Sequence, residues 1–144
     1  MKYQKFKSDF IQVTLHAIVF DGSKPKQVSK ALEKIQKVLG DHSITRLDLI
    51  NSRGYCASNG FDHQMILVNI DKSHHEQYGA YSIIKAVHHE CNHFMWNELQ
   101  CISSTPTYHN ELEMRLSDWA FLKITSMDYF QGLLKKKSQT TDAV

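Results

Sequence analysis

Two histidines and a glutamate lie close together in the run His89-Glu90-Cys91-Asn92-His93. On a helix, residues four apart lie one above the other on the same face, so the imidazoles of His89 and His93 can bind one zinc ion at about 2.0–2.1 Å each. Glu90 is offset by one residue, which suits a base that holds a zinc-bound water better than a zinc ligand. The run therefore predicts a zinc centre able to hydrolyse peptide bonds.

Each part of such a centre has its own task. Zinc lowers the pKa of its water toward ~7. Glu90 can then take the proton as the hydroxide attacks a peptide carbonyl, and pass it to the leaving amine. For stabilising the oxyanion, Tyr108, His109 and Arg115 are near enough in sequence to be considered, and none is favoured over the others.

A catalytic zinc also needs a third protein ligand and one open position. The next helix is the natural source, and its candidates are His109, Glu111, Glu113 and Asp118. Glu113 shares its helical face with small and apolar residues, whereas Glu111 shares a mostly polar one. A glutamate on an apolar face needs a partner, which a metal would supply. We therefore favour Glu113, with Glu111 as the alternative third ligand.

The apolar residues around the motif recur at helical spacing and predict a helix from about Ala80 to Leu99. Its buried stripe is expected to contain Ile84, Val87, Cys91 and Met95. Cys91 should therefore act as a small hydrophobic residue and not as a nucleophile or ligand. His88 precedes the motif without a partner glutamate in register, so we expect it to serve in helix packing or to support the ligands.

The N-terminal half predicts alternating strands and a helix. Residues Ile11 to Phe20 and Ile44 to Ile50 are rich in branched apolar residues and predict two strands. Between them, an amphipathic helix is predicted, with Ser23 as its cap, Pro25 in its first turn, apolar positions from Val28 to Leu39, and Gly40 closing it. Residues 51–62 predict a turn or loose hairpin. Gln64 to Ile70 predicts a third strand, buried on both faces over part of its length.

The C-terminal part is expected to be helical. A loop is predicted from Cys101 to His109, followed by a helix from about Glu111 to beyond Leu122. The apolar stretch from Met127 to Leu134 either continues that helix or starts a short one. Residues 138–144 predict a disordered tail. The expected fold is α+β, a single domain over residues 1–137, with a three- to four-stranded sheet packed on the N-terminal helix and on the motif helix.

Composition narrows the function classes. The chain has 144 residues, a net charge of +2 and mixed basic and acidic residues, which gives no indication of a nucleic-acid or membrane partner. The run Lys135-Lys136-Lys137 is interpreted as a solvated helix end. Three cysteines without regular spacing favour a reducing compartment. With no apolar signal-like segment and no membrane-length run, the expected location is cytoplasmic. Oligomeric state is left open.

The motif and the glutamate about twenty residues after it resemble the gluzincins, zincin metallopeptidases whose third zinc ligand is a glutamate. The stretch from Glu113 to Ala120 is similar to their E-x-x-x-D-x-x-A pattern, with Ser117 in the place of the aspartate. The compact layout also resembles small peptidases of phages and mobile elements, of the repressor-cleaving or SprT-like type. In these, the strand before the motif helix is the edge on which substrate lies, and Gln64 to Ile70 has that place in this chain.

The resemblance implies a hydrolase that uses one zinc ion to cleave a protein or peptide substrate. It implies that His89, His93 and Glu113 are the metal ligands and that Glu90 is the general base. Ser117 in place of the aspartate leaves a second interpretation open. In that interpretation, the chain is a non-catalytic zinc-binding or regulatory inhibitor module on a zincin-like fold.

Overall fold

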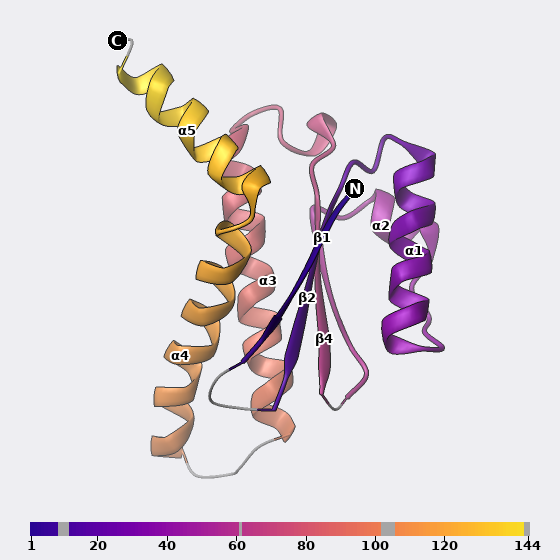
Figure 1. The fold of residues 1–144 in the computed structure, drawn as a ribbon, viewed down its shortest axis with the longest axis vertical. Coiled ribbons are helices and arrows are strands. Elements are labelled where there is room, and N and C mark those ends of the chain that lie inside the picture. The colour runs from indigo at the N-terminus through magenta and orange to yellow at the C-terminus, as the bar shows by residue number, and fades with distance from the viewer. Residues whose placement is uncertain (9–11, 61, 102–105, 143–144) are drawn as a thin grey trace.

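In the computed structural model a four-stranded mixed sheet lies between two layers of helices (Figure 1). The structure describes residues 1–8, 12–60, 62–101 and 106–142, with side chains described outside residues 96–114 and 136–142. Helices α1 and α2 cover one face of the sheet, and α3 to α5 lie on the other side. The chain is therefore an α+β protein, as the sequence predicts.

The sheet has the strand order β1-β2-β4-β3. Its strands are β1 (Lys2–Lys7), β2 (Thr14–Phe20), β3 (Gly54–Ser58) and β4 (His63–Asn69). The two central strands β2 and β4 run parallel, and each edge strand pairs antiparallel with its central neighbour. Strand β4 is buried from its second residue to its last, as expected for a central strand covered on both faces.

Alternation along the central strands divides the apolar side chains between two cores. On one face, Ile18, Phe20, Met65 and Leu67 pack with residues of α1 and α2. On the other face, Leu15, Val19, Ile66 and Val68 pack with residues of α3, α4 and α5. The second core holds α3 against the sheet, and α3 carries the run from His89 to His93.

Within the described ranges, five α-helices and one short 3-10 helix complete the fold. They are α1 (Pro25–Leu39), α2 (Arg46–Ile50), η1 (Lys72–His74), α3 (Ala80–Cys101), α4 (Pro106–Thr125) and α5 (Asp128–Asp142). Over the described residues, none of the helices combines the length with the apolar character that a bilayer span requires.

Several sequence predictions are confirmed within a few residues. Helix α1 starts at Pro25 and ends before Gly40, whose φ of 77° lies in the left-handed region that favours glycine. Strand β4 corresponds to the predicted strand at 64–70, and α3 to the predicted motif helix. The predicted strand at 11–20 is β2, although residue 11 lies outside the described residues.

The predicted strand from Ile44 to Ile50 is wrong, because most of it is helix α2. Thr45 and Asp48 form a capping box: the Thr45 hydroxyl accepts from the Asp48 amide at 3.1 Å, and the Asp48 carboxylate accepts from the Thr45 amide at 2.8 Å. These two bonds satisfy amides that a helix start would otherwise leave unpaired. Local capping therefore outweighs the strand preference of the branched apolar residues.

Both edge strands differ from expectation. The segment predicted as a turn or loose hairpin contains β3, and β1 was not predicted at all. Each is rich in polar or small residues, and neither contains a buried residue, so neither shows the apolar pattern typical of a strand. Their strand structure depends on pairing with β4 and β2, which lie elsewhere in the sequence.

The C-terminal helices also begin or end outside their predicted bounds. Helix α4 starts at Pro106, so residues 106–109 are helical where a loop was predicted, while residues 102–105 lie outside the described part. Proline is well suited to a helix start because the amide of the first helical residue has no acceptor within the helix, so the N–H that proline lacks is not missed there. Helix α5 is separate from α4 and extends to Asp142, into the segment 138–144 for which the sequence predicted a disordered tail.

A chain of polar side chains joins β1, β2 and β4. The Tyr3 hydroxyl lies 2.7 Å from Nδ1 of His16, and Nε2 of His16 lies 2.9 Å from Nδ1 of His63. Burial, with smaller contributions from the nearby charges of His63, Lys34 and Lys5, lowers the pKa of His16 to about 4. A neutral His16 ring fits this chain, since it can accept from Tyr3 and donate to His63.

His16 should make the protein less stable in mild acid. Its folded pKa of about 4 lies below the ordinary value of 6.5, so the unfolded state binds more protons between these values and stability falls as pH falls from 6.5 toward 4. We expect the urea-derived free energy of unfolding to drop by about 1–2 kcal/mol more in wild type than in His16→Gln between pH 7.5 and pH 5. His88→Gln, which alters an exposed histidine, should retain the wild-type dependence. An equal drop in wild type and His16→Gln would contradict this account.

Candidate metal centre

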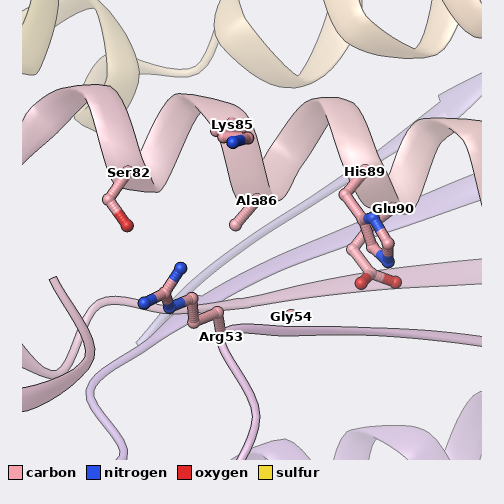
Figure 2. Close-up of a pocket in the computed structure, with 7 residues that line it drawn as sticks. All are labelled: Arg53, Gly54, Ser82, Lys85, Ala86, His89 and Glu90. Carbon is pink, nitrogen blue, oxygen red and sulfur yellow. The ribbon is translucent and has the colours of Figure 1, made fainter. Parts of the chain in front are cut away.

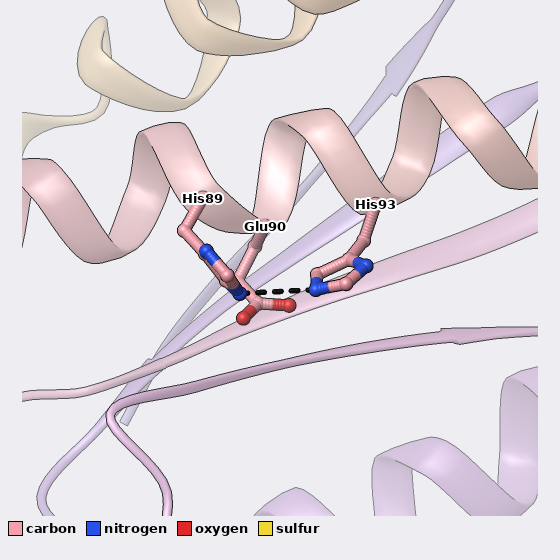
Figure 3. A group of neighbouring side chains, drawn as sticks. All are labelled: His89, Glu90 and His93. Atoms are coloured by element: carbon pink, nitrogen blue, oxygen red, sulfur yellow. Dashed lines mark hydrogen bonds between the residues drawn. The ribbon is translucent and has the colours of Figure 1, made fainter.

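The two motif histidines converge on one point beside the sheet (Figure 3). Nε2 of His89 lies 3.0 Å from Nε2 of His93, and the ring planes are inclined at 77°. Two nitrogen ligands about 2.0–2.1 Å from a tetrahedral zinc ion would lie about 3.3 Å apart. The separation of the two nitrogens is therefore close to that of two zinc ligands, and both side chains are exposed, which leaves room for a further ligand.

Glu90 lies beside this pair but is buried, with 6% of the residue exposed. Its carboxylate oxygen and the two histidine nitrogens lie within 4.8 Å of one another, so the three residues could hold a metal ion. Burial raises the pKa of Glu90 to about 7. A buried carboxylate is costly without a nearby cation, which a metal at the histidine pair would provide.

The two imidazole nitrogens are donors of a type that zinc takes in proteins, and other divalent transition metals accept the same donors. The carboxylate of Glu90 is close enough either to bind a metal there or to hold a water beside it. Helix α3 presents the histidines on one exposed face and turns Glu90 toward the sheet. His89 and His93 are four residues apart, and Glu90 directly follows His89, so a helix produces this arrangement, as the sequence predicts.

Strand β3 approaches the centre through a glycine. A Cβ atom added at Gly54 would lie 2.8 Å from Cγ of Glu90 and 3.2 Å from its Cδ and Oε1 atoms. Any side chain at this position would therefore displace Glu90 or move the strand. Nothing in the sequence indicates this contact, because it joins two residues that are distant along the chain.

Two recesses open between α3 and β3, and both are lined by Gly54, His89 and Glu90. One has a volume of about 340 Å³ and is completed by Arg53, Ser82, Lys85 and Ala86 (Figure 2). The other has a volume of about 380 Å³ and is completed by Ser52, Tyr55, Cys56 and His93. The two recesses are hereafter called the α3–β3 cleft, and the histidine–glutamate cluster lies where they meet.

The third ligand lies outside the described side chains. Glu113, Glu111 and His109 are on helix α4, but their side chains are not among those described. Asp118 is described and exposed, and the cluster that could hold a metal does not include it. Glu113, with Glu111 as the alternative, therefore stays a prediction.

Contacts of α4 define which side of α3 it occupies. The Phe121 ring packs edge-on against His88 with centroids 5.7 Å apart, and the Ser117 hydroxyl donates to Oδ1 of Asn92 at 3.1 Å. Helix α4 thus follows the side of α3 formed by the residues that directly precede His89 and His93. The packing role expected of His88 is confirmed, and the Ser117 hydroxyl donates to Asn92 and to neither His89 nor His93.

Cys91 is fully buried within the core that includes Val87 and Phe94. Burial, with a smaller contribution from Glu90, raises the pKa of its thiol to about 12. The thiolate needed for nucleophilic attack or metal binding is therefore disfavoured. The expectation that Cys91 acts as a small hydrophobic residue is confirmed.

The edge of the sheet beside the centre is not the strand that the sequence indicated. The segment Gln64 to Ile70 was expected to be the edge, but β4 lies between β2 and β3. Strand β3 is the edge strand, and it contributes Gly54, Tyr55 and Cys56 to the cleft. The prediction is wrong because β3, which precedes β4 in the sequence, pairs with the outer side of β4 and forms the edge of the sheet.

No family model matches the chain, and comparisons with curated proteins and with solved structures find no match. The function is therefore inferred from the geometry of the site.

The close approach of Gly54 to Glu90 can be tested by a double-mutant cycle. We expect Gly54→Ala to lower the free energy of unfolding by about 1–3 kcal/mol, because the added methyl group has no space. In a Glu90→Ala background the same change should cost much less. Gly132→Ala in α5, where an added Cβ meets nothing within 4 Å, is the control. An equal cost of Gly54→Ala in both backgrounds, measured by urea unfolding, would disprove the contact.

Metal binding can be tested on purified protein by elemental analysis. We expect wild type to carry one equivalent of zinc and His93→Ala to lose most of it, since one of two converging ligands is removed. His88→Ala changes the neighbouring exposed histidine, which faces α4, and should retain the metal. Lack of zinc in both wild type and His93→Ala, after dialysis against zinc and buffer, would exclude the centre.

Proposed function

We propose that this protein is a zinc-dependent metallopeptidase that hydrolyses peptide bonds of a protein or peptide substrate. The observation that carries the proposal is the convergence of the His89 and His93 nitrogens at 3.0 Å beside the buried carboxylate of Glu90. In the proposal, His89, His93 and Glu113 hold one zinc ion, with Glu111 as the alternative to Glu113. The exposure of both histidines supports an open position for water and substrate.

In the proposed hydrolysis, the metal and the protein have separate roles. When bound, a zinc ion supplies Lewis acidity, which lowers the pKa of a coordinated water toward ~7 and polarises a substrate carbonyl. Glu90 accepts the proton of the attacking water as the new C–O bond forms. It then delivers that proton to the amine nitrogen as the peptide C–N bond breaks. The backbone of β3 at Gly54 keeps the carboxylate of Glu90 in place for both transfers.

Strand β3 is the surface on which we place the substrate. It pairs with β4 on one side, and it stands at the end of the strand order. An extended peptide can add to such an edge through backbone hydrogen bonds. Because β3 lines the cleft through Gly54, a peptide lying there would pass directly by Glu90 and the histidine pair.

The second candidate is a non-catalytic zinc-binding or regulatory inhibitor module. One observation favours it: Ser117 occupies the place of the aspartate in the resembled pattern, and it binds Asn92 and no ligand histidine. Such a module would have a closed centre with four protein ligands and no water. The exposed histidine pair beside the cleft favours the peptidase over this alternative.

The role of Glu90 is tested by Glu90→Gln, which keeps the shape of the side chain and removes the base. We expect this variant to retain zinc while cleavage of denatured casein falls by about 10²–10⁴-fold. His93→Ala, by contrast, should lose both zinc and cleavage. Full activity of Glu90→Gln would exclude Glu90 as the base. A wild-type protein that binds zinc but cleaves nothing would support the non-catalytic module.

A further inference from the structure

The two ends of the α3–β3 cleft differ in charge. The recess completed by His93 also contains Ser52, Tyr55 and Cys56 and no side chain with a fixed positive charge. The recess on the other side of Glu90 contains both Arg53 and Lys85. Figure 2 shows the Arg53 guanidinium directed into the space below α3, between Ser82 and the strand. A substrate lying across the centre would therefore meet two cations on one side only.

The two cations have no partner of opposite charge in the described part of the chain. The ion pair described there joins His63 and Asp62, and the only acidic side chain lining the cationic recess is Glu90. Two positive groups that share one recess repel each other and are stabilised by an anion between them. An unpaired pair of this kind favours a negatively charged ligand.

The backbone fixes where the cations lie relative to the centre. The carbonyl of Arg53 accepts from the Asn69 amide at 2.9 Å, which holds this residue at the start of β3, directly before Gly54. Lys85 lies four residues before His89 on α3, so the two share a helical face. Arg53 lies directly before Gly54 on the β3 wall of the cleft, and Lys85 lies one helical turn before His89 on the α3 wall.

We propose that the recess of Arg53 and Lys85 is a specificity subsite for a carboxylate of the substrate, so that the enzyme cleaves next to an acidic group. This inference rests on the proposed peptidase function and names its substrate class. Arg53 can bind a carboxylate through two parallel N–H···O bonds, and Lys85 adds a second charge-assisted donor from the opposite wall. The carboxylate comes either from an aspartate or glutamate side chain or from the C-terminus of the peptide.

Binding of two matched probes tests the subsite without relying on turnover. Both are hydroxamates with a short alkyl chain, ending in a carboxylate in one and in a primary amide in the other. On the zinc-loaded Glu90→Gln protein, calorimetry should show the carboxylate probe binding about 10-fold more tightly than the amide probe. Arg53→Gln with Lys85→Gln should weaken binding of the carboxylate probe and reduce this ratio to about 1. Lys30→Gln, an exposed lysine on α1 across the sheet, is the matched control.

The outcomes separate this inference from the proposed function. Equal binding of the two probes to the parent protein, or a ratio that survives the double substitution, overturns the subsite and leaves the metal centre intact. Failure of both probes to bind the zinc-loaded protein overturns the metal centre and the subsite with it.

Cleavage products distinguish the two sources of the carboxylate. Mass spectrometry of a casein digest should show either internal cuts at a fixed position next to aspartate or glutamate, or stepwise loss of C-terminal residues. Arg53→Glu should weaken either preference and favour cuts next to lysine or arginine. Cuts with no acidic preference in wild type would overturn the subsite while confirming the peptidase.

Discussion

The burial of the Glu90 carboxylate is the constraint on which the rest of the site depends. A carboxyl group withdrawn from water is tolerated when it is neutral or lies next to a cation, and the neighbouring histidine pair could hold such a cation. The burial is possible because β3 presents Gly54, with no side chain, to helix α3. A strand, a helix and a candidate metal position are thus linked through a single acidic side chain.

The two layers of helices contribute differently to this arrangement. Helices α1 and α2 cover the far face of the sheet and provide no residue to the α3–β3 cleft. Their contribution is to bury the second face of β2 and β4, which makes the central strands a firm base for α3. Helix α4 supports α3 through its contacts with His88 and Asn92. The site therefore lies on a helix that one core packs against the sheet.

Prediction from sequence succeeded where a pattern lies within one element. Helix α3 follows from its apolar periodicity, and the grouping of His89, Glu90 and His93 follows from helical spacing alone. It failed where structure depends on a local cap, as at α2, or on pairing with a distant strand, as at β3. The approach of Gly54 to Glu90 and the cation pair across the cleft had no sequence signal, because each joins two elements that only the folded sheet brings together.

Strand β3 has a further consequence for how the protein moves. It is five residues long, none of them is buried, and it pairs with a single neighbour, so separating it from the sheet exposes little apolar surface. Opening of this strand is therefore less costly than global unfolding, and its amides exchange with solvent hydrogen sooner than those of β4. His89 and His93 lie on helix α3, which packs on the second core, so opening of β3 would widen the cleft without moving the histidine pair.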